Sequence, residues 1–293
     1  MTDVGVRRGS DVRRGRLQPA RSWDAHAHVI GSAPEFPFSP GRGYTPPASS
    51  LDAYLAMLDR HGLPHGVLVQ PSVYGFDNRC LLDALDRAGG RLAGVAVPAP
   101  DASAADLEGM HRRGVRGIRC NLFNPGGLSP DVVAGWQPVL RALGWHVEFQ
   151  LSIVDVPDWT DWLTRFDVPV VIDHMGRPGP GRADPASRHV RPLVDAVRDS
   201  ACYVKLSAPY RNSGQAPPWP DVTPLAQALV DANSRACLWS TDWPHVDTPA
   251  QVRTDNLFDA LDAWCPNDAV RHLVMTEAAH RLFAGPGGDP AGG

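Results

Sequence analysis

Two histidines separated by a single residue, His26 and His28, lie in the first segment that reads as a β-strand, residues 23–30. Side chains alternate between the two faces of a strand, so both imidazoles are expected on the same side. Neighbouring imidazoles can hold a metal ion or polarise a carbonyl oxygen. An isolated His-x-His is more often a pair of ordinary strand histidines, so its meaning depends on the rest of the chain.

Two downstream segments supply the partners that such chemistry needs. DHMGRP (173–178) contains His174 and Arg177, and STDWPH (240–245) contains Asp242. Opening an ester requires a positioned water, a base that activates it, and donors aimed at the developing negative charge. A carboxylate with three imidazoles could provide all of these. Arginine adds a planar fork that can bond both oxygens of a carboxylate.

The elements that must position these residues repeat as a short apolar run, a loop and a helical stretch. Eight such units predict parallel strands, because parallel pairing needs crossover connections and leaves both faces covered. A closed (β/α)8 TIM barrel is therefore predicted. An open doubly wound sheet is the alternative, although no glycine-rich fingerprint follows the first strand. The predicted strands are 23–30, 65–70, 92–97, 115–122, 145–151, 168–175, 202–207 and 236–241.

A single barrel domain is expected over residues 21–284, between a flexible leader (1–20) and a flexible tail (285–293). The leader has arginines but no apolar core, so we do not interpret it as a secretory signal. Helical patterns at 251–264 and 268–283 follow the last strand, and the second is an additional C-terminal helix.

In this fold, reactive residues gather where strands end and the following loops begin. Histidines, a carboxylate and arginines converging at one rim predict an active site there. The polar side chains expected at this rim are His26, His28, Ser72, Tyr74, Arg119, Gln150, His174, Ser207 and Asp242, with Arg177 and Arg211 in the loops after strands six and seven.

Composition restricts the class of protein. The formal net charge is -4 and the pI is about 6.2, which argues against a nucleic-acid partner because such proteins carry a concentrated basic surface. No apolar run approaches the roughly 18 residues of a membrane helix. The 5 cysteines are scattered without CxxC spacing, as expected for reduced thiols in a cytoplasmic protein. A homo-oligomer is compatible with the sequence.

Four segments together resemble a known family. DAHAH (24–28), GIR (117–119), IDHMGRP (172–178) and TDWPH (241–245) are similar, in the same order, to the amidohydrolase superfamily. More narrowly, they resemble the group of 2-pyrone-4,6-dicarboxylate lactonase and its relatives. The resemblance covers about residues 22–284. That group hydrolyses cyclic esters, in some members without the divalent metal that is usual in the superfamily.

The resemblance also implies roles for individual residues. Asp242 would be the general base that takes a proton from water. Three histidines would polarise the carbonyl and stabilise the oxyanion: His26, His28 and His174. The group's substrate-contacting positions fall on Tyr44 and Ser72, and its carboxylate-holding positions fall on Arg119, Arg177 and Arg211. Tyr74 and Gln150 join the substrate-binding set because they lie at the expected rim.

Two departures from the group affect the expected substrate. Pro125 stands where the group has a further arginine, and Gln150 stands where it has a tyrosine. Loss of one anionic clamp and one aromatic donor favours a lactone or cyclic ester with fewer charges than the dicarboxylate.

The same residues raise the question of a metal. His26, His28 and Asp242 could supply three ligands to one Zn²⁺ and leave a position open for water. The superfamily's further histidine ends strand five, where this chain has Gln150, and His146 lies at the opposite end of that strand. No lysine ends strand four to bridge two metals. We expect no required cofactor, with a single Zn²⁺ as the alternative.

The sequence therefore predicts a hydrolase that opens a lactone or related cyclic ester of a carboxylated small molecule. The runner-up is a non-oxidative decarboxylase of the same superfamily, which bound stoichiometric zinc would favour. A lactone isomerase could use the same base and acid. From another class, a catalytically inactive barrel would only bind a carboxylate, although such proteins usually lose the base that Asp242 provides here.

Overall fold

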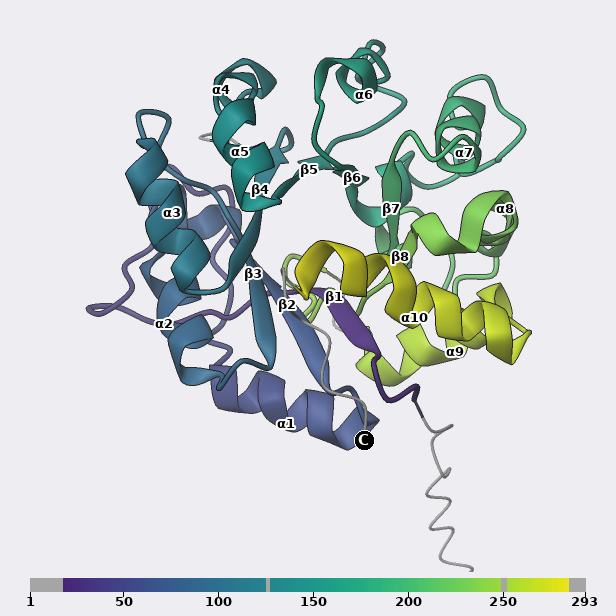
Figure 1. Cartoon of the computed structure of the whole chain (residues 1–293). Helices are drawn as coiled ribbons and strands as arrows, with labels where there is room; N and C mark the ends of the chain where they lie inside the picture. Colours follow the sequence, from purple (N-terminus) through teal and green to yellow (C-terminus); the bar gives the residue numbers. More distant parts are fainter. Residues whose placement is uncertain (1–17, 125–126, 249–251, 285–293) are drawn as a thin grey trace, which may run out of the picture.

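The computed structural model describes residues 18–124, 127–248 and 252–284, which form a ring of strands surrounded by helices (Figure 1). The 8 strands make one sheet in chain order, and every neighbouring pair is parallel. The predicted (β/α)8 barrel is confirmed. The strands are β1 Trp23–Ala27, β2 His65–Val69, β3 Leu92–Ala96, β4 Val115–Asn121, β5 His146–Gln150, β6 Val170–Ile172, β7 Tyr203–Leu206 and β8 Cys237–Trp239.

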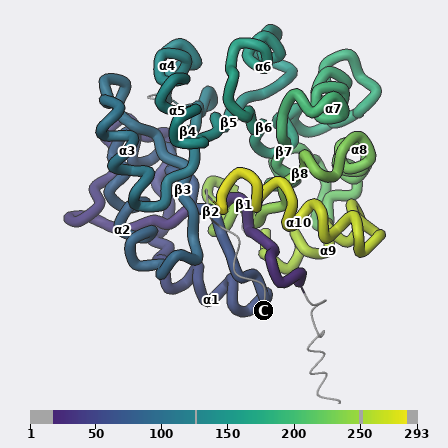
Figure 2. The backbone as a smooth tube through the Cα atoms, viewed as in Figure 1, coloured from purple at the N-terminus to yellow at the C-terminus, as the bar shows by residue number. Residues whose placement is uncertain are grey.

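Helices occupy the outside of the ring, as the backbone trace in Figure 2 shows. Their sequences carry the expected end signals. Gly62 ends the first helix in the left-handed region, with φ of 68°, and its amide donates to the carbonyls of Asp59 and Leu58. The α-helices are α1 Leu51–His61, α2 Arg79–Arg87, α3 Ala104–Arg112, α4 Pro130–Gly135, α5 Gln137–Leu143, α6 Asp161–Arg165, α7 Arg191–Arg198, α8 Thr223–Asn233, α9 Thr254–Trp264 and α10 Asp268–Phe283.

Short 3-10 turns follow or precede several strands. Three of them start within four residues of a strand's carboxyl end and so shape the rim where an active site was expected. The 3-10 turns are η1 Ser72–Tyr74, η2 Asp173–Gly176, η3 Pro209–Arg211 and η4 Ser234–Ala236. The sixth strand was predicted to reach residue 175, but it ends at Ile172 because η2 begins there.

At the amino-terminal ends of the strands, the barrel interior is apolar and is closed by α10. Side chains of β2 and β3 contribute only small and branched groups to this cluster, including Val67 and Val95. Phe283 at the end of α10 packs against Trp23, with ring centroids 5.9 Å apart. In Figure 1, α10 crosses the end of the barrel beside β1 and β8. The additional C-terminal helix therefore covers the end of the barrel opposite the expected active site.

Residues 1–17 of the predicted leader and the predicted tail, 285–293, lie outside the described residues, as does Pro125. Within the described part of the chain, no helix has both the length and the apolar character needed to cross a bilayer.

Candidate active site

Four side chains from three places in the sequence meet at the carboxyl ends of the strands. We call His26, His28, His174 and Asp242 the mouth cluster; all four are buried. Asp242 Oδ1 lies 3.7 Å from His26 Nε2 and 3.5 Å from His28 Nε2. The rings of His26 and His174 have centroids 4.8 Å apart. The structure thus brings together the four residues that the sequence singled out for catalysis.

The seam that closes the barrel sets the spacing within this cluster. Between β8 and β1, the amide of Asp242 donates to the carbonyl of His26 at 2.9 Å. The amide of His28 donates to the carbonyl of Trp243 at 2.7 Å. The base and the paired histidines are therefore fixed to each other through backbone, not only through side chains.

Asp24 braces the same seam from behind. Its carboxylate accepts the amide of Thr241 at 2.8 Å and the hydroxyl of Thr241 at 2.6 Å, and it also accepts the hydroxyl of Tyr54 from α1. The strand register shifts between Asp24 and Ala27, which interrupts simple alternation. Asp24 therefore does not share the face of His26, although it lies only two residues before it.

Left-handed backbone is concentrated around the mouth cluster. His174, Met175 and Arg177 have φ of 53°, 55° and 44°, and Asp242 has φ of 55°. Such conformations are costly for residues with a Cβ and persist where the surroundings enforce them, often at active sites. Here they turn the chain sharply after β6 and β8, so His174 and Asp242 point back over the barrel.

The electrostatic environment keeps Asp242 ionised, and burial lowers the pKa of both His26 and His174. Burial alone would raise the pKa of Asp242. The rings of His174 and His28 and the guanidinium of Arg211 outweigh burial and hold that pKa well below its usual range. Burial, then the positive charge of Lys205, lowers the pKa of His26 to about 3. Near neutral pH the cluster therefore presents a carboxylate acceptor beside uncharged His26.

Beneath the mouth cluster lies a second group of charged side chains inside the barrel. We call Arg119, Glu148, Asp173 and Lys205 the ionic layer; all four are buried. Lys205 Nζ lies 2.6 Å from Glu148 Oε1 and 3.4 Å from Asp173 Oδ1. Arg119 Nε donates to Asp173 Oδ2 at 3.1 Å. Two cations thus face two anions with no net charge.

The ionic layer contains functional candidates that sequence reasoning did not find. Lys205 is the only lysine in the sequence, and Glu148 lies between Val147 and Phe149 in a predicted strand. These two signals could have marked both residues as facing the barrel interior. Their pairing could not be read, because β5 and β7 are separated by β6 in the sheet.

Tyr210 is another residue that the sequence did not indicate. From η3, its hydroxyl donates to Asp242 Oδ2 at 2.5 Å. Asp242 Oδ1 has no hydrogen-bond partner among the described residues, and the same holds for His26 Nε2. The carboxylate is therefore held by one oxygen and presents the other to whatever enters the mouth.

The predicted arginines have different surroundings. Arg119 is committed to Asp173 in the ionic layer. Arg211 donates to the carbonyl of Val246 at 2.9 Å and lies 3.6 Å from Asp242 Oδ2. The guanidinium of Arg177 lies 3.7 Å above the ring of Phe123. Burial, then Arg211, lowers the pKa of Arg177 to about 10, so it remains cationic near neutral pH.

The other polar residues predicted at the rim differ in what their side chains contact. The hydroxyl of Tyr44 hydrogen-bonds with the side chain of Ser72, and burial raises its pKa. Gln150 is buried, and its Oε1 has no hydrogen-bond partner in the described ranges.

Tyr74 instead donates to the carbonyl of Gly31 at 3.0 Å, so its hydroxyl supports the loop after β1. Ser207 contacts His174 Nδ1 at 2.8 Å.

Two sets of buried side chains have donor atoms that could bind a metal ion. His26, His28 and Asp242 offer ligand atoms that all lie within 4.8 Å of one another, as do His26, Asp173 and His174. The surrounding charges oppose a dication, however. Lys205 Nζ lies 3.0 Å from His26 Nδ1, and Arg211 is close to Asp242. The distances between the donor atoms would allow an ion to bind. The positive charges beside two of these side chains, His26 and Asp242, do not fit a dication there.

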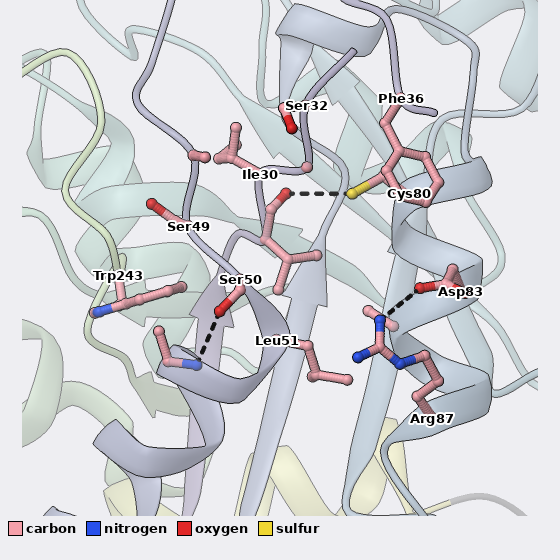
Figure 3. A pocket seen from close by; sticks show the side chains of 15 residues that line it. Ile30, Ser32, Phe36, Ser49, Ser50, Leu51, Cys80, Asp83, Arg87 and Trp243 are labelled. Atoms are coloured by element: carbon pink, nitrogen blue, oxygen red, sulfur yellow. Dashed lines mark hydrogen bonds and ion pairs between the residues drawn. The ribbon is translucent and has the colours of Figure 1, made fainter. Parts of the chain in front are cut away.

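A separate cavity of about 470 Å³ lies beside the loop after β1, between α1 and α2. Its walls include Ile30, Phe36, Leu51 and Trp243, as Figure 3 shows. Its lining contains no member of the mouth cluster. This cavity is therefore distinct from the candidate active site.

Comparison with known proteins agrees with this architecture. The family model described as amidohydrolase matches residues 23–285. The chain belongs to the amidohydrolase family. A Hydrogenophaga intermedia protein named 4-sulfomuconolactone hydrolase is 32% identical over 277 residues, which are 91% of this chain and 90% of that relative. A Comamonas testosteroni protein named 2-pyrone-4,6-dicarboxylate hydrolase is 32% identical over 280 residues, or 90% of each chain.

A solved Pseudomonas putida structure, provisionally described as a 2-pyrone-4,6-dicarboxylic acid hydrolase, matches with a TM-score of 0.77. It is 32% identical, and the match covers 91% of this amidohydrolase and 98% of that chain. The resemblance drawn from the four sequence segments is thereby confirmed at the level of the family.

Proposed function

We propose that this amidohydrolase opens a lactone that carries an anionic substituent. The observation that carries the proposal is the position of Asp242 Oδ1. This oxygen is buried, free of hydrogen bonds within the described residues, and faces His26 Nε2 and His28 Nε2 within 3.7 Å. A base held beside imidazoles suits activation of a water next to a polarised carbonyl.

In the proposed reaction, Asp242 accepts a proton from water while the water oxygen bonds to the carbonyl carbon. Imidazole donors of the mouth cluster stabilise the resulting oxyanion. The ring C–O bond then breaks, and the proton passes from Asp242 to the leaving oxygen. The product is an open chain with a new carboxylate and a hydroxyl group. Tyr210 keeps the second oxygen of Asp242 in place throughout.

The anionic substituent is assigned to Arg177 and Arg211. Both are partly buried, both interact electrostatically with Asp242, and Arg177 remains charged near neutral pH. Guanidinium groups bind carboxylate or sulfonate oxygens through a planar fork of donors. The relatives named above support this class, since the names of both refer to anionic lactone substrates.

We further propose that hydrolysis requires no bound metal. Support comes from the cations beside the metal-ligating atoms, Lys205 at His26 and Arg211 at Asp242. The alternative is one Zn²⁺ on His26, His28 and Asp242. Turnover by protein dialysed against a chelator should equal turnover by untreated protein, and a loss that zinc restores would contradict this part of the proposal.

The test is acid release from a panel of 4-sulfomuconolactone, 2-pyrone-4,6-dicarboxylate, muconolactone and neutral δ-valerolactone. We expect turnover of at least one anionic lactone and a fall of roughly 10³-fold in kcat/KM for Asp242→Asn. Asp231→Asn makes the same change on the exposed surface of α8 and should leave turnover unaffected. Release of CO₂, or a ring transposition seen by NMR, would instead favour a decarboxylase or an isomerase.

A further inference from the structure

We infer that Lys205 is a positioning residue that makes one of the paired histidines a hydrogen-bond donor and leaves the other an acceptor. The geometry of a single ammonium group carries this inference. Lys205 is fully buried, and its Nζ lies 3.0 Å from His26 Nδ1, 2.6 Å from Glu148 Oε1 and 3.4 Å from Asp173 Oδ1. An ammonium has three donors and no acceptor, so each donor faces one of these three acceptors.

The proton of His26 must therefore lie on the far nitrogen. Because Lys205 donates to Nδ1, that atom is the acceptor, and the neutral ring carries its hydrogen on Nε2. The competing partner of Nδ1 is Asp173 Oδ1, at 3.5 Å. The ammonium is nearer to Nδ1, at 3.0 Å, and it also forms an ion pair with that carboxylate oxygen at 3.4 Å. His26 Nε2–H then points at the open side of the mouth cluster, where it has no partner among the residues described.

His28 has the opposite arrangement. Its Nδ1 lies 2.7 Å from the backbone carbonyl of Val69, which can only accept. In the uncharged form of this ring the hydrogen is thus on Nδ1, and Nε2 presents a lone pair. The two rings lie 5.0 Å apart and are perpendicular, yet they offer different chemistry to the same space.

This difference assigns separate tasks to the two histidines if the proposed function holds. His26 donates to the carbonyl oxygen and the oxyanion, and His28 accepts from the water that Asp242 deprotonates. A proton on His26 Nε2 also blocks that nitrogen from binding a metal, because a ligating nitrogen needs its lone pair. Lys205 thus favours acid–base chemistry over metal binding at this pair of histidines.

The experiment compares the double variant Lys205→Met/Glu148→Gln with Glu148→Gln alone. Lys205→Met by itself would leave two carboxylates facing one arginine, which risks unfolding. The double change removes one cation and one anion together. In the matched control, Glu148→Gln, the lysine remains beside His26 and Asp173.

The first readout is the protonation pattern of His26 from ¹⁵N–¹H long-range correlation spectra of histidine-labelled protein, with its signals assigned by their loss in His26→Asn. We expect the proton on Nε2 in the parent and in Glu148→Gln. In the double variant we expect it on Nδ1, donated to Asp173. A proton on Nδ1 in the parent would overturn the inference, even if the double variant fails to fold.

The second readout is Zn²⁺ affinity, measured by calorimetry without any substrate. The double variant should bind zinc at least about tenfold more tightly than Glu148→Gln, the size of effect usual for groups that orient metal ligands. Equal affinity in the two proteins would contradict the inference. If an anionic lactone is turned over, kcat of the double variant should also be roughly 10²-fold lower than kcat of Glu148→Gln, with little change in KM. Absence of turnover would count against the proposed function but leave both other readouts valid.

Discussion

The mouth cluster and the ionic layer occupy adjacent levels of one barrel, yet they use charge differently. In the ionic layer, Lys205 and Arg119 face Glu148 and Asp173 at 2.6–3.4 Å, so cations and anions balance. In the mouth cluster, Asp242 has a guanidinium only at 3.6 Å, and its Oδ1 is left free in the described structure. Charges that close partners neutralise hold a site in place, whereas a carboxylate with no cation in close contact can act on a ligand.

His26 connects the two levels. Its Nδ1 faces the ionic layer and its Nε2 faces Asp242. Burial of charge is expensive unless it is paired, so the ionic layer should matter for stability and the mouth for turnover. Two substitutions test this division, and a third, at Asp24 behind the seam, contrasts with the ionic layer; they follow in order of decreasing effect.

Removing an anion from the ionic layer should have the largest effect on stability. Asp173→Asn leaves Lys205 and Arg119 with one carboxylate fewer, and breaking a buried pair costs roughly 3–5 kcal/mol. Urea unfolding should show this loss in the free energy of unfolding. Asp231→Asn, on the exposed face of α8, should stay within about 0.5 kcal/mol of the parent. Similar values for the two variants would show that the ionic layer does not stabilise the fold.

Burial raises the pKa of Asp173, but Lys205, His26 and Arg119 outweigh burial and hold that pKa well below its usual range. Asp24, whose pKa no cation of the described structure lowers, should show the opposite pH dependence. Burial, only partly offset by Thr241 and Tyr54, raises the pKa of Asp24 to about 6, whereas an unfolded chain has about 3.9. The folded state then holds the extra proton, so this contribution to stability is full below pH 4 and is lost as pH rises through 6.

Asp24→Asn should abolish the loss of stability that accompanies the rise in pH through 6. The difference in unfolding free energy between parent and variant should change by roughly 3 kcal/mol between pH 3 and 7, since one pKa unit is worth about 1.4 kcal/mol. Thermal or urea unfolding across this range measures it. A constant difference at all pH values would mean that Asp24 is not perturbed by its burial.

A change confined to the mouth should alter rate more than stability. Tyr210→Phe removes the hydroxyl that donates to Asp242 Oδ2. We expect kcat to fall about tenfold, because a hydrogen bond to a charged group is worth roughly 1.5–3 kcal/mol. The acidic limb of the kcat/KM profile should move to higher pH, since a donor that favours the ionised carboxylate is lost. An unchanged limb would argue that Tyr210 does not hold the base.

The sequence predicted the barrel and the identity of the mouth cluster for one reason. Parallel strands all point the same way, so polar residues at their carboxyl ends must share a rim wherever the strands close into a barrel. His26, His174 and Asp242 could be brought together by that rule alone. The bounds of α10 were also predictable, because its helical pattern starts after Asn267, whose side chain accepts from the first amides of the helix.

Other features depend on tertiary structure. Tyr74 lies at the rim in sequence, but the 3-10 turn Ser72–Tyr74 directs its hydroxyl to Gly31. Conversely, Tyr210 gave no signal, and a left-handed residue before η3, Ala208 with φ of 47°, precedes the turn that carries it to Asp242. Local turns of this kind redirect side chains by amounts that residue spacing does not reveal.

The amino-acid sequence by itself determined which strands exist, their parallel order and which residues end them, since periodicity and chain direction are local properties. Only the closed barrel decided that Lys205 of β7 meets Glu148 of β5 and His26 of β1 at one point. The physical reason is that the interior of a barrel is narrow enough for side chains from non-adjacent strands to touch. Which nitrogen of His26 faces the reacting space depends on that contact, and no sequence pattern specifies it.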